Sequence, residues 1–194
     1  MNTIFGSDAF SPREIAEKVE NIGVVKARLP LMPMIMLGIL AGVFIGLGAM
    51  YAVLVVSDAS LGFGLSRILG GLVFSMGLIM VVIAGAELFT GNNLLVMAWA
   101  DGKISMGEVL RNWAIVCLAN FVGAAGLAVL VYLSGHYKMN AGGVAEAYTK
   151  IAAAKCNLSF QQAFFTGTLR NVLVCLAGWM SNAGRSVSDK TLVI

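Results

Sequence analysis

The chain has 194 residues, of which 59% are hydrophobic and only 12% are charged, and its mean hydropathy is +0.87. About a quarter of the residues in soluble domains are charged, so this composition indicates an integral membrane protein. The net charge of +3 without a basic run excludes a nucleic-acid-binding protein, and three cysteines without a CxxC pair exclude a disulfide framework or a cysteine-based metal site.

Residues 1–28 contain a predicted amphipathic helix that precedes the apolar part of the chain. Ser11 can cap this helix, and Glu14 three residues later completes a capping box. Its apolar face is formed by Ile15, Val19 and Ile22. We expect this N-terminal region to be cytoplasmic and its helix to lie on the membrane surface.

Three long apolar runs in residues 29–194 predict helices of a transmembrane domain. They cover residues 29–57, 112–137 and 158–183, and about 20 residues suffice to cross a bilayer. Only Arg170 interrupts the last run with a charge. The first run carries a stripe of small residues that is typical of close helix packing, namely Gly38, Gly42 and Gly46.

A further apolar run, residues 67–100, is too long for one straight crossing and too short for two. A continuous helix of this length would reach about 50 Å. The run contains the polar sequence IAGAELFTGNNLLV, which begins at Ile83. We therefore predict a broken helix whose first half ends near Gly85 and whose second half covers residues 93–100. Irregular backbone at membrane depth is tolerated only where protein buries it or it lines an aqueous cavity, so the break indicates a solute pathway.

The loop at the break contains four polar or turn-forming candidates. The Glu87 carboxylate has two open interpretations: it accepts hydrogen bonds from the backbone amides of Thr90, Gly91 and Asn92, which we favour, or it contacts the solute. Thr90 presents its hydroxyl to the pathway or caps the second half-helix. The N-terminus of that half-helix, after Asn93, carries partial positive charge and favours an anion over a cation.

Candidate pathway residues also lie outside the loop. Phe74 and Leu78 share one helix face and precede Leu88 in the loop. Residues at this spacing usually belong to the core, but beside a broken helix they can form an apolar constriction.

Two polar residues, Arg170 and Asn171, lie near the centre of the last span. The Asn171 side chain can form a hydrogen bond to a neighbouring helix. Arg170 must pair with Glu87, extend to the interface, or face water.

The distribution of lysine and arginine predicts a cytoplasmic N-terminus, because these residues are more frequent in the loops on that side. The loop 134–157 is then external, and it contains a predicted short helix, GGVAEAYTKIAAAK, and Lys155. His136, the only histidine, is expected to be a solvated residue of this loop. Because no catalytic motif occurs, we expect neither enzymatic activity nor a cofactor or metal.

Several motifs together resemble the formate/nitrite transporter family, and most closely its formate channel branch. They are GGLVFSMGLIMVVIAGAELFTGN, GKISMGEVLRNW, RNVLVCLAGWMS and GRSVSDK. The resemblance implies an all-α, aquaporin-like helical bundle with a broken second transmembrane helix. It implies a homopentamer in the bacterial plasma (inner) membrane that passes formate or a similar small monovalent anion such as nitrite or hydrosulfide. Passage as in a channel and transport coupled to a proton or to pH both stay open.

The resemblance also implies roles for individual residues. Phe74, Leu78 and Leu88 match constriction positions, and Thr90 matches a threonine that faces the pore. Asn171 matches the pore asparagine, Lys155 a lysine that makes the outer vestibule positive, and Glu87 the family's acidic loop position. Gly91 and Asn92 are expected to shape the same loop. Arg170 departs from the pattern, because relatives carry a small residue or a cysteine there.

Family members have six spans arranged as an inverted repeat. We therefore expect this sequence to contain four complete spans and the start of a fifth at SDKTLVI, with the second half of the repeat largely missing. The family's central pore histidine belongs to that half, and His136 does not match it.

A function of another class stays open at this point. The protein could be a non-transporting membrane subunit that docks a cytoplasmic enzyme through residues 11–26. A water or glycerol channel would need Asn-Pro-Ala loops, which this sequence lacks. A flux assay separates a channel from a docking subunit.

Overall fold

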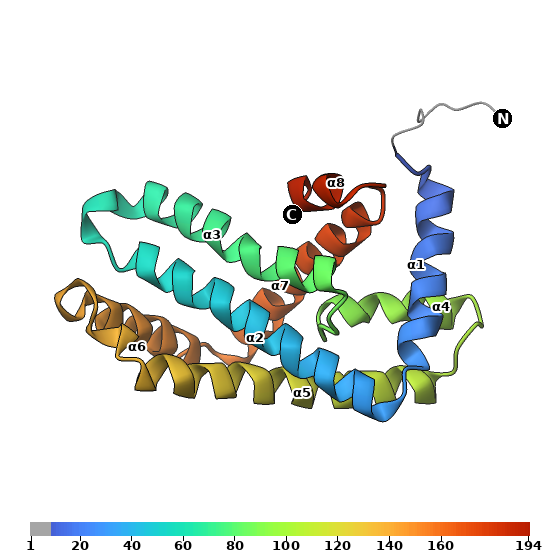
Figure 1. The fold of residues 1–194 in the computed structure, drawn as a ribbon, viewed down its shortest axis with the longest axis horizontal. Coiled ribbons are helices and arrows are strands. Elements are labelled where there is room, and N and C mark those ends of the chain that lie inside the picture. Colours follow the sequence, from blue (N-terminus) through green and yellow to red (C-terminus); the bar gives the residue numbers. More distant parts are fainter. Residues whose placement is uncertain (1–8) are drawn as a thin grey trace.

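A computed structural model describes residues 9–194, and every regular element in this range is helical apart from one bridge between Ala9 and Gly184. The helices are α1 (Pro12–Ala27), α2 (Leu31–Val56), α3 (Gly62–Ala84), α4 (Leu95–Ala100), α5 (Met106–Leu133), α6 (Gly143–Cys156), α7 (Phe160–Ser181) and α8 (Val187–Leu192). Short 3₁₀ turns connect some of them. Figure 1 shows α2, α3 and α5 lying side by side, with α1 running across one end of this group.

Four helices, α2, α3, α5 and α7, are long and apolar enough to cross a membrane. They confirm the predicted spans with shifted ends. The helix α5 begins at Met106, six residues before the predicted apolar run at 112, because a capping box between Ser105 and Glu108 extends it beyond the apolar segment. The helix α3 likewise begins at Gly62 rather than at Arg67.

Glycines allow the central helices to approach closely. A Cβ atom added at Gly48 of α2 would lie 2.8 Å from the backbone oxygen of Phe74, and one added at Gly77 of α3 would lie 2.9 Å from that of Phe44. The predicted stripe of α2 packs on α5, because a Cβ atom at Gly38 would lie 2.6 Å from the Cβ of Ala119. The helix-contact interpretation of this stripe is therefore confirmed.

The predicted broken helix is present. The helix α3 ends at Ala84, and Gly85 follows in the left-handed region at φ 67° and ψ 30°. The chain then continues without regular structure to a 3₁₀ turn, Gly91–Leu94, and to the short helix α4. Ala86 and Glu87 are buried, so protein surrounds the irregular backbone at its start. Figure 1 shows this loop between α3 and α4, next to α2.

The N-terminal helix begins as predicted. The Ser11 hydroxyl accepts a hydrogen bond from the Glu14 amide at 3.3 Å, and the Ser11 amide donates to the Glu14 carboxylate at 2.7 Å. Its apolar face packs against α4. The position of this helix at the membrane surface stays a prediction. The buried residues are Ile15, Val19, Gly23 and Ala27, whereas Ile22 is only partly buried. The small side chains at 23 and 27 create the close fit, because a Cβ at Gly23 would lie 3.1 Å from the Cβ of Ala98.

The opposite end of the bundle carries α6, the short helix predicted in the loop 134–157 (Figure 1). Within this loop, His136 is partly buried and packs edge-on against Tyr148, with ring centroids 6.3 Å apart. It is therefore not the solvated residue that the sequence suggested. Its aromatic ring is partly covered because the turn after α5 folds back onto α6.

Candidate functional site

The loop at the break is held by a buried ion pair. The Glu87 side chain is 3% exposed, and its Oε1 lies 2.9 Å from the Nζ of Lys26 in α1. Its second oxygen, Oε2, accepts a hydrogen bond from the Asn92 side-chain amide at 2.7 Å. A carboxylate removed from water needs such partners, because an unpaired buried charge is strongly destabilising.

Two asparagines close this pair into a connected network. Lys26 Nζ also donates to Asn92 Oδ1 at 3.0 Å, and the Asn92 amide donates to Asn112 Oδ1 at 2.9 Å. The Asn112 amide returns to the backbone oxygen of Lys26 at 3.1 Å. The network joins α1, the loop and α5, and both asparagines are almost completely buried. We refer to these four residues, Lys26, Glu87, Asn92 and Asn112, as the loop network.

A third asparagine, Asn120 of α5, satisfies the loop backbone. Its Oδ1 accepts a hydrogen bond from the backbone amide of Phe89 at 2.8 Å. Its side-chain amide donates to the backbone oxygens of Glu87 at 2.8 Å and of Gly38 at 2.7 Å. The Glu87 amide donates to the Leu37 oxygen at 3.2 Å. Backbone groups that lack helical partners thus find partners inside the protein instead of in water.

The structure corrects two expectations about Glu87. Its carboxylate binds the side chains of Asn92 and Lys26, not the backbone amides of Thr90, Gly91 and Asn92. It also does not pair with Arg170. The reason is that α1 crosses the end of the bundle and brings a lysine to the loop, which sequence distance does not reveal.

Three residues of the site were missed at the sequence level: Lys26, Asn112 and Asn120. A signal existed for the two asparagines, since side-chain amides are costly inside an apolar span unless they bond to a neighbour. Lys26 gave no such signal, because a lysine near the end of a surface helix is ordinary.

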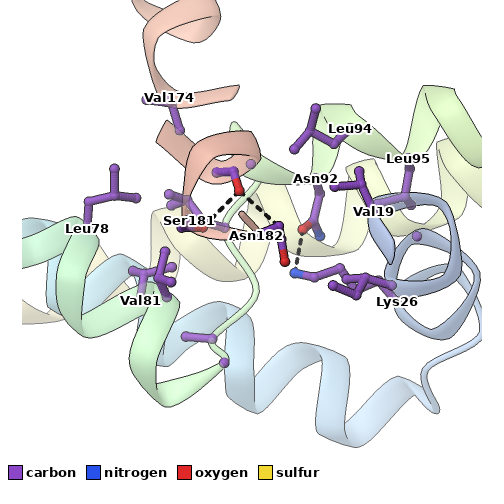
Figure 2. A pocket seen from close by; sticks show the side chains of 18 of the residues that line it. Val19, Lys26, Leu78, Val81, Asn92, Leu94, Leu95, Val174, Ser181 and Asn182 are labelled. Atoms are coloured by element: carbon purple, nitrogen blue, oxygen red, sulfur yellow. Dashed lines mark hydrogen bonds between the residues drawn. The ribbon is translucent and has the colours of Figure 1, made fainter. Parts of the chain in front are cut away.

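A cavity of about 270 Å³ lies beside the loop, between α1, α3 and α7. Figure 2 shows its polar side, where Lys26 and Asn92 meet, and its apolar side, formed by Leu78, Val81 and Val174. The lining also includes two residues predicted for the site, Leu88 and Gly91. Asn182 and Lys190, which follow α7, line it as well. A cavity with one polar and one apolar wall suits a small polar solute.

Lys190 of α8 lines the cavity, and two further cations, Lys18 and Arg185, lie near Lys190 outside the cavity lining. Burial lowers the pKa of Lys18, and the neighbouring cations Lys190 and Arg185 lower it further. Lys18 is also held in place, since its Nζ donates to the Asn182 oxygen at 3.2 Å. The carboxylates of Glu14 and Asp189 lie among these cations, so the charges of this region partly compensate one another.

The other predicted site residues lie apart from the cavity lining. Phe74 is 41% exposed on α3, and Lys155 is exposed in the last turn of α6. The Thr90 hydroxyl makes no capping hydrogen bond, which removes the helix-cap interpretation. The backbone oxygen of Thr90 accepts a hydrogen bond from Cys175 Sγ at 3.4 Å. The Oδ1 of Asn171 is buried without a hydrogen-bond partner in the described part of the chain.

Solved structures of other proteins have the same fold. The chain is 34% identical to a structure described as a pentameric formate channel with formate bound, with a TM-score of 0.77 over 94% of this chain and 66% of that one. A structure of an FNT family ion channel gives a TM-score of 0.83 at 28% identity, over 93% of this chain and 72% of that one. The all-α, multi-pass membrane fold with a broken second spanning helix is therefore shown.

Sequence comparison gives the same answer. The chain is 37% identical to the formate channel FocA of Escherichia coli strain K12 over 188 residues, which cover 96% of this chain and 66% of that protein. The chain thus spans just under two thirds of that relative's length. The sequence profile of the formate/nitrite transporter family matches residues 13–194. On this evidence the chain belongs to the formate/nitrite transporter family.

Proposed function

We propose that the protein passes formate, or a similar small monovalent anion such as nitrite or hydrosulfide, across a bacterial plasma membrane. The observation that carries the proposal is the buried, broken helix with a cavity at its loop and lysines at the cavity's end. Irregular backbone at this depth is tolerated where protein buries it or where it lines an aqueous cavity, as it would beside a solute pathway. The formate channels among its relatives support formate as the solute.

In this proposal, the anion is attracted by the cations around Lys18 and Lys190 on one side and by Lys155 on the other. It loses water at the apolar residues Phe74, Leu78 and Leu88, where a bare charge is costly. Thr90 and Asn171 offset part of this cost by hydrogen bonds. Passage of the protonated acid is the alternative route across the apolar segment.

The proposed assembly is a homopentamer with a cytoplasmic N-terminus. The pentameric formate channel among the similar structures supports the assembly, and the distribution of lysine and arginine supports the orientation. An enzyme-docking role for α1 has little apolar surface available, because the stripe of Ile15, Val19, Gly23 and Ala27 is already buried.

The test is formate flux into liposomes that contain the full-length protein, with protein-free liposomes as the control. We expect saturable flux in the wild type and a reduction of at least about tenfold in Thr90→Ala, because this substitution removes a hydroxyl donor from the dehydrated segment. Wild-type liposomes that take up formate no faster than protein-free ones contradict the proposed function. Unaltered flux in Thr90→Ala removes only Thr90 from the mechanism.

A further inference from the structure

Arg170 is a charged residue near the middle of the spanning helix α7, and it makes no ion pair or hydrogen bond with any residue of the described range 9–194. A charge at this depth in a bilayer is costly, and such residues face the protein interior or water rather than lipid. The pathway proposed above uses constriction and loop residues and assigns no role to Arg170.

Arg170 is exposed and is not itself part of the cavity lining, and the helical repeat places it at one edge of the α7 surface that faces the cavity. Val174, Gly178 and Ser181 line the cavity from α7. They follow Arg170 by four, eight and eleven positions, so all of them lie along one stripe of the helix. Figure 2 shows Val174 and Ser181 at the cavity, and Arg170 continues this stripe by about 6 Å, one helical turn, toward the middle of the membrane.

No carboxylate in the described range is available to neutralise Arg170. Glu87 is the only one at the depth of the break, and it is buried against Lys26 and Asn92. The other described carboxylates belong to α1, to helix-connecting turns, or to the first turns of α5, α6 and α8. A second copy of the same segment therefore has no suitable carboxylate either.

The next residue supplies an independent sign of a polar environment at this depth. Asn171 Oδ1 is buried and has no hydrogen-bond partner among the described residues. A buried acceptor without a donor indicates a place that water or a protonated ligand completes. Arg170 and Asn171 thus place a cation and an unused acceptor at the same depth of α7, on adjoining faces of the helix.

We propose that Arg170 is an anion-binding residue at the middle of the pathway, specific for planar anions with two oxygens, the class that includes formate and nitrite. This inference rests on the proposed function and deepens it. A guanidinium presents two parallel N–H donors that match two oxygens of one anion, which a chloride or hydrosulfide ion cannot match.

The test compares formate flux of the full-length protein and its Arg170→Gln and Arg170→Lys variants in liposomes. We expect the half-saturation concentration for formate to rise about tenfold in Arg170→Gln, because a charge acts strongly on an anion in a poorly hydrated path. Arg170→Lys should recover most of this loss but lose preference for formate and nitrite over chloride in competition. The matched control is Arg67→Gln, which removes an exposed arginine of α3 that lies over the Phe63 ring and should leave the half-saturation concentration unchanged.

Arg170→His provides a second variant that separates charge from structure. Histidine is charged below about pH 6.5 and neutral above it. Relative to the wild type at the same pH, its half-saturation concentration should therefore be higher at pH 8 than at pH 5.5. A structural arginine would give no such dependence.

The proposal is overturned if the half-saturation concentration in Arg170→Gln equals that of the wild type. It is also overturned if Arg170→His shows the same ratio to wild type at both pH values. Absence of flux in the wild type contradicts the proposed function itself, whereas wild-type flux with unaffected Arg170 variants contradicts only the role of Arg170.

Discussion

Glu87 shows how one residue constrains the whole loop. Its carboxylate is almost completely buried, and it is stable there only because Lys26 and Asn92 supply a charge and a hydrogen bond. The Lys26 side chain is 27% exposed and therefore keeps contact with water. Removing Lys26 therefore leaves the Glu87 carboxylate buried without a counter-charge, whereas removing the Glu87 charge leaves a lysine that can still reach water.

The first prediction follows from this asymmetry. Lys26→Met leaves a buried, unpaired carboxylate and should lower the free energy of unfolding by about 3 kcal/mol. Glu87→Gln should cost less, because Lys26 can turn to water, and the double variant should recover part of the Lys26→Met loss. Unfolding in detergent micelles measures these values.

The control for this cycle is the exposed pair Arg13–Glu17 in α1, whose side chains are 88% and 56% exposed. Arg13→Gln should change the free energy of unfolding by less than about 0.5 kcal/mol. If Lys26→Met and Arg13→Gln lower the free energy of unfolding equally, the buried Lys26–Glu87 pair contributes no more to stability than an exposed pair.

At the scale of elements, four capping boxes begin α1, α5, α7 and α8. The boxes of α1 and α8 rely on carboxylates: hydrogen bonds from Ser11 lower the pKa of Glu14, and those from Ser186 lower the pKa of Asp189. The box of α7 uses Gln162, which does not titrate. The ends of similar helices therefore differ in their response to acid.

The second prediction concerns this response. Because the folded pKa values of Glu14 and Asp189 lie below their unfolded values, their contribution is present above the unfolded pKa and is lost as pH falls through the folded one. Amides at the starts of α1 and α8 should exchange faster with solvent, relative to intrinsic rates, as the pH falls below about 4. Amides at the start of α7 should not, and equal behaviour of all three helix starts contradicts the prediction.

Helix packing gives the third prediction. A Cβ at Gly77 would lie 3.2 Å from the Cα of Ile45 and closer to backbone oxygen of α2, so Gly77→Ala should lower stability by about 1–3 kcal/mol. Gly71, in the same helix α3, has open space around it. Gly71→Ala should raise stability by about 0.5–1 kcal/mol, because alanine favours the helix. Thermal unfolding of both variants checks the opposite signs.

At the scale of the whole molecule, α7 is the least covered spanning helix. Its apolar window has no buried residue within the chain, and Phe160, Leu169 and Leu173 are 87%, 67% and 67% exposed. Much of α3 is likewise exposed. Lipid or other protein segments must cover these surfaces.

The fourth prediction is the assembly state. Native mass spectrometry of the full-length protein released from detergent should give the mass of five copies, in agreement with the proposed assembly. The exposed helix surfaces supply area for contacts between copies. A monomer under conditions that preserve flux contradicts the pentamer.

The sequence by itself determined the membrane class, the spans, the start of α1 and the break after Gly85. These features depend on local chemistry: apolar length, capping residues, and a glycine that adopts the left-handed region. Helix ends were less well determined, because hydropathy marks the apolar segment and a capping box such as Ser105–Glu108 lies outside it.

Only the tertiary structure decided which side chains satisfy the break. Lys26 and Asn120 contact Glu87, and Asn112 contacts Asn92, although all three lie far from the loop along the chain. They meet the loop because α1 crosses the bundle while α5 packs along α2. The sequence could state that a carboxylate at this depth needs partners, but it could not name them. A partner is fixed by the packing of distant helices, and that packing depends on small residues such as Gly23 and Gly38 that allow the close approach.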